Sequence, residues 1–147
     1  MTNKDIQAYL YEQIPLTRAM AIAVTEASET EVRLSAPLAP NINHQESAFG
    51  GSISAAAMLS CWTLMHIRLR QIETPTQLVI HKNNIIYREP VLDKFEAVCR
   101  FPKEEAWQDV LTMLERCGKA KIILNADIWC RARKVAVFQG SFVTLKA

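Results

Sequence analysis

The sequence lacks the features that mark metal-binding, disulfide-rich and secreted proteins. Its four cysteines, Cys61, Cys99, Cys117 and Cys130, are widely spaced, with no Cys-x-x-Cys pair and no neighbouring histidine pattern. We therefore expect no zinc site, and reduced thiols are the simplest account of these residues. The first 14 residues also lack the basic-then-apolar order of a signal peptide. These absences predict a cytoplasmic protein with neither a metal nor a cofactor.

An excess of one charge is lacking as well. The chain has 17 Lys and Arg residues against 15 Asp and Glu residues, and its isoelectric point is about 8.4. Nucleic-acid-binding proteins are usually more basic, with clustered lysines and arginines. Arg131, Arg133 and Lys134 do cluster, but a solvated hairpin turn explains them better. The sequence therefore predicts no nucleic-acid partner.

The chain has no internal repeat, low-complexity tract or linker. At 147 residues, with 50% hydrophobic and 22% charged residues, it can form one ordinary hydrophobic core. We expect residues 1–147 to form a single domain.

Charged residues are absent between Ser47 and Ile67, directly after a polar loop that begins at Asn41. About 20 apolar residues can span a bilayer. This run, however, contains five polar residues between Ser52 and His66, and strand-like segments flank it. A helix buried in the protein is the better interpretation, and we expect no membrane association.

Periodicity predicts the remaining elements. Alternating apolar residues indicate strands, and apolar residues at helical spacing indicate helices. Without regular strand–helix alternation, the sheet should be antiparallel, in an α+β fold. Gly140 suggests a bulge or a close backbone approach in the last strand. The expected helices cover residues 5–14, 52–70 and 103–117, and the expected strands cover residues 19–26, 30–36, 77–87, 95–101, 120–130 and 134–145.

Two motifs carry a resemblance to a known family. SAPLAPNIN…FGGS (residues 35–52) and IIYREPV (residues 85–91) resemble segments of hotdog-fold thioesterases. More specifically, the first motif resembles a thioesterase-like domain family. Members of this family occur alone or fused C-terminal to an N-acetyltransferase domain. The resemblance implies a long central helix wrapped by a curled antiparallel sheet of about six strands. It also implies a homodimer joined edge to edge, with a tetramer as an alternative, and acyl-CoA or acyl carrier protein thioesters as substrates.

The chain departs from this family pattern at two positions. Phe49 stands where many relatives have the histidine of His-Gly-Gly, and Met58 stands where many have a catalytic Asp or Glu. The usual general base is therefore missing from the helix.

The candidate catalytic residues lie in the loop and at the start of the long helix. Backbone N–H groups of Gly50 and Gly51 can stabilise negative charge on a thioester oxygen. Asn43 can hold a carbonyl, a carboxylate or a water, although an Asx turn would also explain it. Glu46 is a substitute base if water attacks, or else a solvated loop acid. His44 is either a base or an ordinary loop residue.

Substrate binding is expected from the helix and from the strand that follows it. Charged side chains there could bind phosphate, and apolar ones could line an acyl pocket. His66 is expected to be a satisfied core histidine, and His81 a strand residue facing solvent or a partner. The candidate substrate-binding residues are Phe49, Met58, Lys82, Asn84, Tyr87 and Arg88.

Three functions remain open. A thioesterase-like hydrolase is the first prediction. A decarboxylase of malonyl-acyl-carrier-protein or malonyl-CoA, feeding fatty acid synthesis, is the second. The resemblance implies it, because members of the narrower family are reported to decarboxylate malonyl groups on carrier protein, and that reaction needs carbonyl polarisation and little free water. A non-catalytic acyl-CoA sensor is the third.

Overall fold

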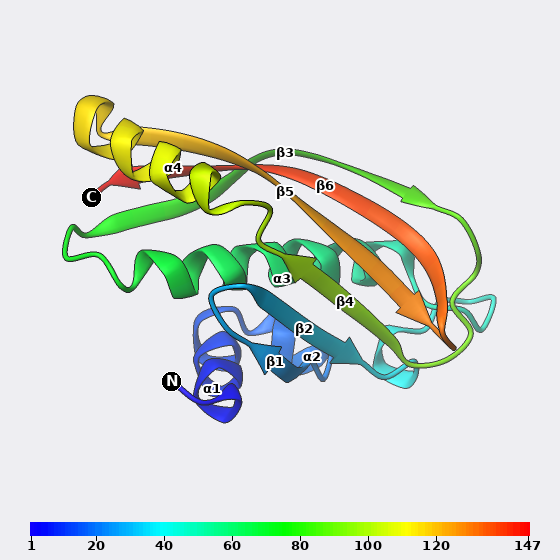
Figure 1. Cartoon of the computed structure of the whole chain (residues 1–147). Coiled ribbons are helices and arrows are strands. Elements are labelled where there is room, and N and C mark those ends of the chain that lie inside the picture. Colours follow the sequence, from blue (N-terminus) through cyan, green and yellow to red (C-terminus); the bar gives the residue numbers. More distant parts are fainter.

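The computed structural model describes residues 1–147 as one antiparallel sheet curled around a long helix (Figure 1). The six strands lie in the order β1-β2-β4-β5-β6-β3. The predicted α+β arrangement is therefore confirmed. The elements are α1 (Asn3–Gln13), α2 (Leu16–Ala19), β1 (Ala23–Ala27), β2 (Glu31–Ala36), η1 (Ala39–Asn41), α3 (Gly50–Leu69), β3 (Thr76–Tyr87), β4 (Phe95–Arg100), α4 (Glu104–Cys117), β5 (Lys119–Cys130) and β6 (Arg133–Lys146).

Helix α3 is buried because its sequence is apolar on nearly every side. Ala57, Cys61, Leu64 and Met65 have no exposed surface. The sheet supplies the opposing apolar side chains from alternate positions of its strands, as in β5, where every second residue is buried. The predicted central helix is confirmed, and it begins two residues earlier than expected.

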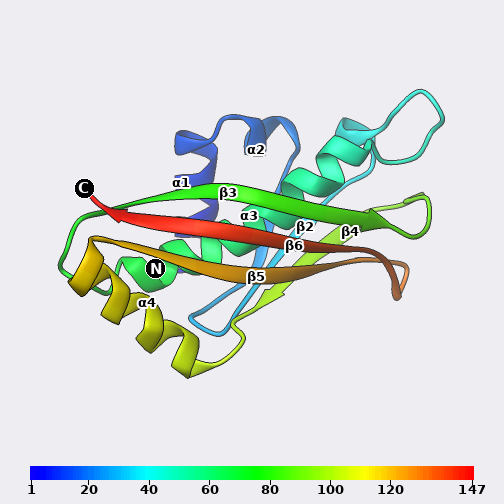
Figure 2. The same ribbon diagram turned by 90° about the horizontal axis from the view of Figure 1, so that it is seen from above.

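Helix α4 lies alongside the first half of β5 (Figure 2). Trp107, Val110 and Leu114 are its buried residues. Gly118 ends the helix in the left-handed conformation, with φ of 70°, which glycine adopts without a Cβ penalty. The predicted second long helix is confirmed.

The expected first strand, residues 19–26, is wrong in its first half. Pro15 has φ of −53° and starts the short helix α2, and β1 begins only at Ala23. Ala21 has φ of 55°, which is incompatible with a strand. A short apolar run does not distinguish strand from buried helix, so the preceding proline decides the local structure.

The β5–β6 hairpin confirms the long alternation in the sequence. Its two turn residues, Arg131 and Ala132, have φ of 51° and 63°, as the backbone of a type I′ turn requires. Gly140 is a point of close approach, because a Cβ there would lie 2.8 Å from the ring of Phe142 and 2.9 Å from that of Phe138.

Strand β3 forms one edge of the sheet and pairs only with β6. Its register shifts between Ile80 and Lys82, so His81 occupies a β-bulge. Beyond the bulge, Ile85 and Tyr87 lie on the side of α3, whereas Asn84 and Ile86 lie on the opposite face.

Candidate active site

The N-terminus of α3 presents two free backbone donors. The N–H groups of Ser52 and Ile53 donate to the carbonyl of Phe49 at 3.0 and 3.2 Å. Those of Gly50 and Gly51 have no acceptor in the protein, and no side chain caps the helix. Both point outward from the positive end of a helix of 20 residues. This arrangement can bind an oxygen that gains negative charge.

The Phe49 ring lies close against Gly51, so a side chain at Gly51 would force this exposed ring to move. A Cβ at Gly51 would overlap the Phe49 ring, which lies against it. Phe49 is 58% exposed and occupies the N-cap position of α3. Ile42 and Leu92 are also exposed, and each follows a residue whose carbonyl accepts from the chain just before α3: Asn41 from Phe49 N–H and Val91 from Ala48 N–H. Three exposed apolar residues therefore lie in the segments that adjoin the start of α3.

Tyr87 joins the end of β3 to the start of α3. Its hydroxyl donates a hydrogen bond to the carbonyl of Gly50 at 2.8 Å. Partial burial raises the pKa of Tyr87, so the phenol stays protonated near neutral pH. Of the predicted substrate-binding residues, Tyr87 and Phe49 are thus brought to the helix start.

Asn43 closes the loop that leads into α3. Its Oδ1 accepts from the N–H groups of Gln45 and Ser47, at 2.8 and 3.2 Å, and its Nδ2 donates to Ser47 Oγ at 3.0 Å. These bonds form an Asx turn, which is the structural role considered for Asn43. One Nδ2 hydrogen has no partner in the protein. The predicted catalytic role of Asn43 stays a prediction.

His44 and Glu46 lie at the exposed tip of the same loop. Glu46 has φ of 63°, and neither side chain forms a hydrogen bond or an ion pair with the protein. Both are free to turn toward a ligand. Their predicted roles as bases also stay predictions.

The other predicted substrate-binding residues lie farther away. Met58 is half-buried, against the core. Arg88 is exposed and follows β3. Lys82 and Asn84 line a hollow on the sheet face that points away from α3, together with Ser141 and Gln139. The structure therefore separates these two residues from the free donors.

Sequence reasoning missed Asn41 as a support of this site. Its carbonyl accepts from Phe49 N–H at 2.7 Å, and its buried Nδ2 donates to the carbonyls of Met20 and Pro37 at 3.0 and 2.8 Å. It thus ties the start of α3 to two distant segments. Only its place after Pro40 in a polar loop marked it in the sequence.

His66 differs from its prediction as a satisfied core histidine. Its ring stacks between Tyr9 and Trp62, with centroids 4.7 and 4.9 Å away, but its buried Nε2 has no hydrogen-bond partner. Burial is the main cause that lowers the pKa of His66, and Arg70 adds to it. The neutral form is therefore favoured.

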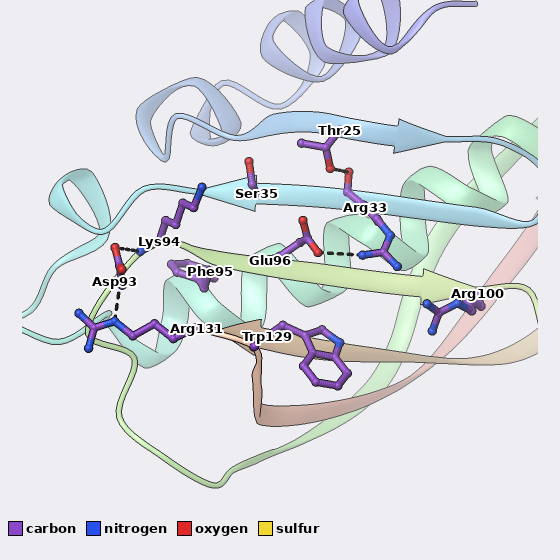
Figure 3. Close-up of a pocket in the computed structure, with 11 residues that line it drawn as sticks. Thr25, Arg33, Ser35, Asp93, Lys94, Phe95, Glu96, Arg100, Trp129 and Arg131 are labelled. Carbon is purple, nitrogen blue, oxygen red and sulfur yellow. Dashed lines mark hydrogen bonds and ion pairs between the residues drawn. The ribbon is translucent and has the colours of Figure 1, made fainter.

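A large surface hollow lies apart from the helix start (Figure 3). It has a volume of about 600 Å³ and crosses the outer face of the sheet from Thr25 to Trp129. Two of its four basic side chains pair with the carboxylates that line it, with Arg33 3.0 Å from Glu96 and Arg131 3.3 Å from Asp93. The hydrogen bonds to the Asp93 carboxylate lower its pKa, those from Lys94 N–H and Arg131 foremost. This hollow contains none of the predicted catalytic or substrate-binding residues.

No group of three or more His, Cys, Asp or Glu side chains could hold a metal ion. All four cysteines are free, and only Cys117 is exposed. None of the helices combines the length and the apolar character needed to cross a membrane.

A family model described as "Putative thioesterase (yiiD_Cterm)" matches residues 3–146. The chain belongs to this family. The hotdog fold is thereby confirmed, as is the resemblance stated from the two motifs. Membership in the yiiD_Cterm family supports a thioesterase-like function and an acyl thioester as substrate.

Solved structures agree with this assignment. A crystal structure described as a "putative thioesterase" from Shewanella oneidensis is 29% identical, with a TM-score of 0.85 over 97% of this chain and 96% of that one. A protein of unknown function from Chlorobaculum tepidum is 28% identical, with a TM-score of 0.93 over 99% and 94%. A thioesterase from Haemophilus influenzae has a TM-score of 0.78 over 99% and 92% at 13% identity, and so shares the fold.

Proposed function

We propose that this protein is an enzyme that processes acyl thioesters of CoA or acyl carrier protein at the start of α3. The observation that carries the proposal is the pair of unpaired N–H groups at Gly50 and Gly51. The thioester oxygen would accept from these donors as negative charge builds on it. The protonated hydroxyl of Tyr87 holds the Gly50 carbonyl and so orients the first turn of the helix.

Hydrolysis is the first of two proposed reactions, and it needs a base to activate water. Glu46 and His44 are the ionisable groups of the adjacent loop, and Asn43 holds that loop in shape. Each would have to approach the substrate from the exposed loop tip. The family description favours hydrolysis.

Decarboxylation of a malonyl thioester is the second candidate. No acidic residue occurs anywhere in α3, and Met58 occupies the position expected for a catalytic acid. Phe49, Ile42 and Leu92, the exposed apolar residues in the segments that adjoin the start of α3, would favour loss of carbon dioxide by excluding water from the carboxylate of a bound malonyl group.

A homodimer is proposed as the active form. Strand β3 is an edge strand of 12 residues, and natural proteins seldom leave so long an edge unpaired. Pairing of two copies along β3 would also bring a partner strand near Tyr87 and the helix start. Analytical ultracentrifugation tests this proposal, and a monomer at micromolar concentration would contradict it.

Proline substitution at Gly50 tests the donor role directly. Gly50 is the first residue of α3, where proline is tolerated, and Phe49 has ψ of 132°, which suits a residue before proline. Gly50→Pro removes one N–H group, whereas Gly50→Ala keeps it and serves as the matched control. We expect kcat of the proline variant to fall by about 10²–10³ relative to the alanine variant. Equal turnover by two equally stable variants would contradict the proposal.

The reaction itself is identified by products. Acetyl-, malonyl- and longer acyl-CoA, and the corresponding carrier-protein thioesters, are incubated with the protein and resolved by mass. Free thiol indicates hydrolysis, and conversion of malonyl to acetyl thioester indicates decarboxylation. Unchanged substrate that co-purifies with the protein indicates the sensor instead of an enzyme.

A further inference from the structure

Two adjoining hollows lie on the face of the sheet that points away from α3. No helix lies over the middle of β3, β6 and β5 on this face, and α4 borders it at β5 (Figure 2). The hollows have volumes of about 410 and 250 Å³. They are lined by His81, Met113, Cys117, Lys119, Ala120, Lys121 and Val143, and by Lys82, Asn83, Asn84, Ile123, Gln139 and Ser141.

The positive charge of these hollows is not neutralised. Lys82, Lys119 and Lys121 line them together with His81, and no carboxylate does. None of these lysines takes part in any of the seven ion pairs of the protein. The hollow of Figure 3 differs, because carboxylates pair with its arginines. We call His81, Lys82, Lys119 and Lys121 the outer basic surface.

Unsatisfied hydrogen-bonding groups lie beside these charges. Ser141 is 4% exposed, and its buried Oγ has no partner. Lys82 is its register partner on β3, and Asn84 is paired with Gln139. The side chains of Lys82 and Asn84 form no hydrogen bond with the protein. A buried hydroxyl without a partner costs about 1–3 kcal/mol, so a ligand that accepts from it gains stability.

We propose that the outer basic surface binds a phosphate group. Lysine ammonium groups bind phosphate as point charges, and hydroxyl and amide N–H groups add hydrogen bonds to its oxygens. The smaller hollow, with Lys82, Asn84 and Ser141, holds the phosphate, and Lys121 and Lys119 extend the positive field. A second copy of this surface is a poor occupant, because like charges would face one another.

This site is separate from the proposed active site. Lys82 precedes Tyr87 by five residues on the same strand, roughly 16 Å at 3.3 Å per residue, and it lies on the other face of the sheet. The inference therefore does not depend on the thioester chemistry. Its test needs no turnover.

Titration of the full-length protein with inorganic pyrophosphate tests the inference. Calorimetry and backbone amide shifts should show saturable binding, with shifts centred on residues 81–84 and 139–143. Lys82→Gln should weaken binding by about tenfold, as expected for the loss of one charge-assisted hydrogen bond. Lys94→Gln is the matched control, since it removes the same charge from the hollow of Figure 3, and it should change affinity less than about twofold.

Ser141→Ala distinguishes a binding role from a packing role. The variant removes an unsatisfied buried hydroxyl, so its thermal stability should stay equal or rise, while its affinity for pyrophosphate falls. Binding that does not saturate, or that weakens equally in Lys82→Gln and Lys94→Gln, would overturn the proposal. So would unchanged affinity in both Lys82→Gln and Ser141→Ala.

Competition identifies the source of the phosphate. If CoA displaces pyrophosphate while dephospho-CoA does so less well, the 3′-phosphate of the nucleotide occupies the site. If pyrophosphate binds equally well in the presence of CoA, a separate phosphorylated ligand does. Both results support a phosphate site, and the variants above decide whether it exists.

Discussion

Arg68 should be the most sensitive charged residue for stability. It lies in the last turn of α3, 3% exposed. Its Nε donates to the carbonyl of Glu29 at 2.8 Å, and its two terminal nitrogens donate to the Glu104 carboxylate at 3.0 and 3.3 Å. Its guanidinium also lies 3.7 Å from the ring centroid of Phe101. One side chain thus joins α3, the β1–β2 turn and α4.

The expected cost of Arg68→Ala follows from these contacts. A hydrogen bond from a charged donor contributes about 1.5–3 kcal/mol, and the stacking on Phe101 adds about 1 kcal/mol. Glu104 is 67% exposed, so water can replace Arg68 around its carboxylate. We therefore expect the free energy of unfolding to fall by about 2.5–4 kcal/mol. Glu104→Gln leaves the buried Arg68 without its counter-charge but keeps an amide oxygen as acceptor, so it should cost less than Arg68→Ala, about 1–2 kcal/mol.

Urea unfolding at a fixed protein concentration measures both changes, because an oligomer would make stability concentration-dependent. The midpoint should shift with an unchanged slope. Thermal unfolding should show the melting temperature of Arg68→Ala lowered by roughly 6–12 °C. Equal losses for Arg68→Ala and Glu104→Gln would refute the reasoning, since they would make the ion pair, rather than the buried hydrogen bond and stacking, the dominant contribution.

Three further predictions concern the backbone, pH and packing. Ala132→Gly should stabilise the protein by about 0.5–1 kcal/mol in urea unfolding, because Ala132 has φ of 63°; the same change at Ala8 in α1 should destabilise it. The unfolded chain protonates His66 at a higher pH than the folded chain does, since burial lowers the pKa of His66 in the folded state. The free energy of unfolding should therefore fall as pH drops below about 6.5, and the decline in melting temperature from pH 7.5 to 5.5 should be shallower in His66→Phe. Gly140→Ala should cost about 1–3 kcal/mol by overpacking two phenylalanine rings, and an unchanged urea midpoint would contradict this.

The loop before α3 shows how much of the candidate site the local sequence pattern predicts. The sequence places Asn43 before Gly50 and Gly51, and the family motif marks all three. It leaves open whether Asn43 contacts substrate or shapes the loop. The bonds from Asn43 to Gln45 and Ser47 give it a shaping role in the folded chain, a choice that depends on side-chain rotamers.

Strand β3 shows what alternation alone leaves undecided. The sequence predicts the strand and singles out Lys82, Asn84 and Tyr87 together. Alternation already places Tyr87 on the opposite face from Lys82 and Asn84, and the bulge at His81 decides which face that is. Because of the bulge, Ile80 before it and Tyr87 beyond it both lie on the side of α3. A bulge depends on pairing with β6, which is distant in sequence.

The sequence by itself determined the α+β class, the buried central helix, the strand alternation and the family. These follow from local periodicity and from motifs that lie within short segments. Only the tertiary structure decided which donors stay free at α3, that Asn41 supports them and that Arg68 joins three elements. It alone also gathered three unpaired lysines and Ser141 on the outer face. The reason is physical: these features depend on contacts between residues far apart in the chain, and local propensity does not encode which of those contacts form.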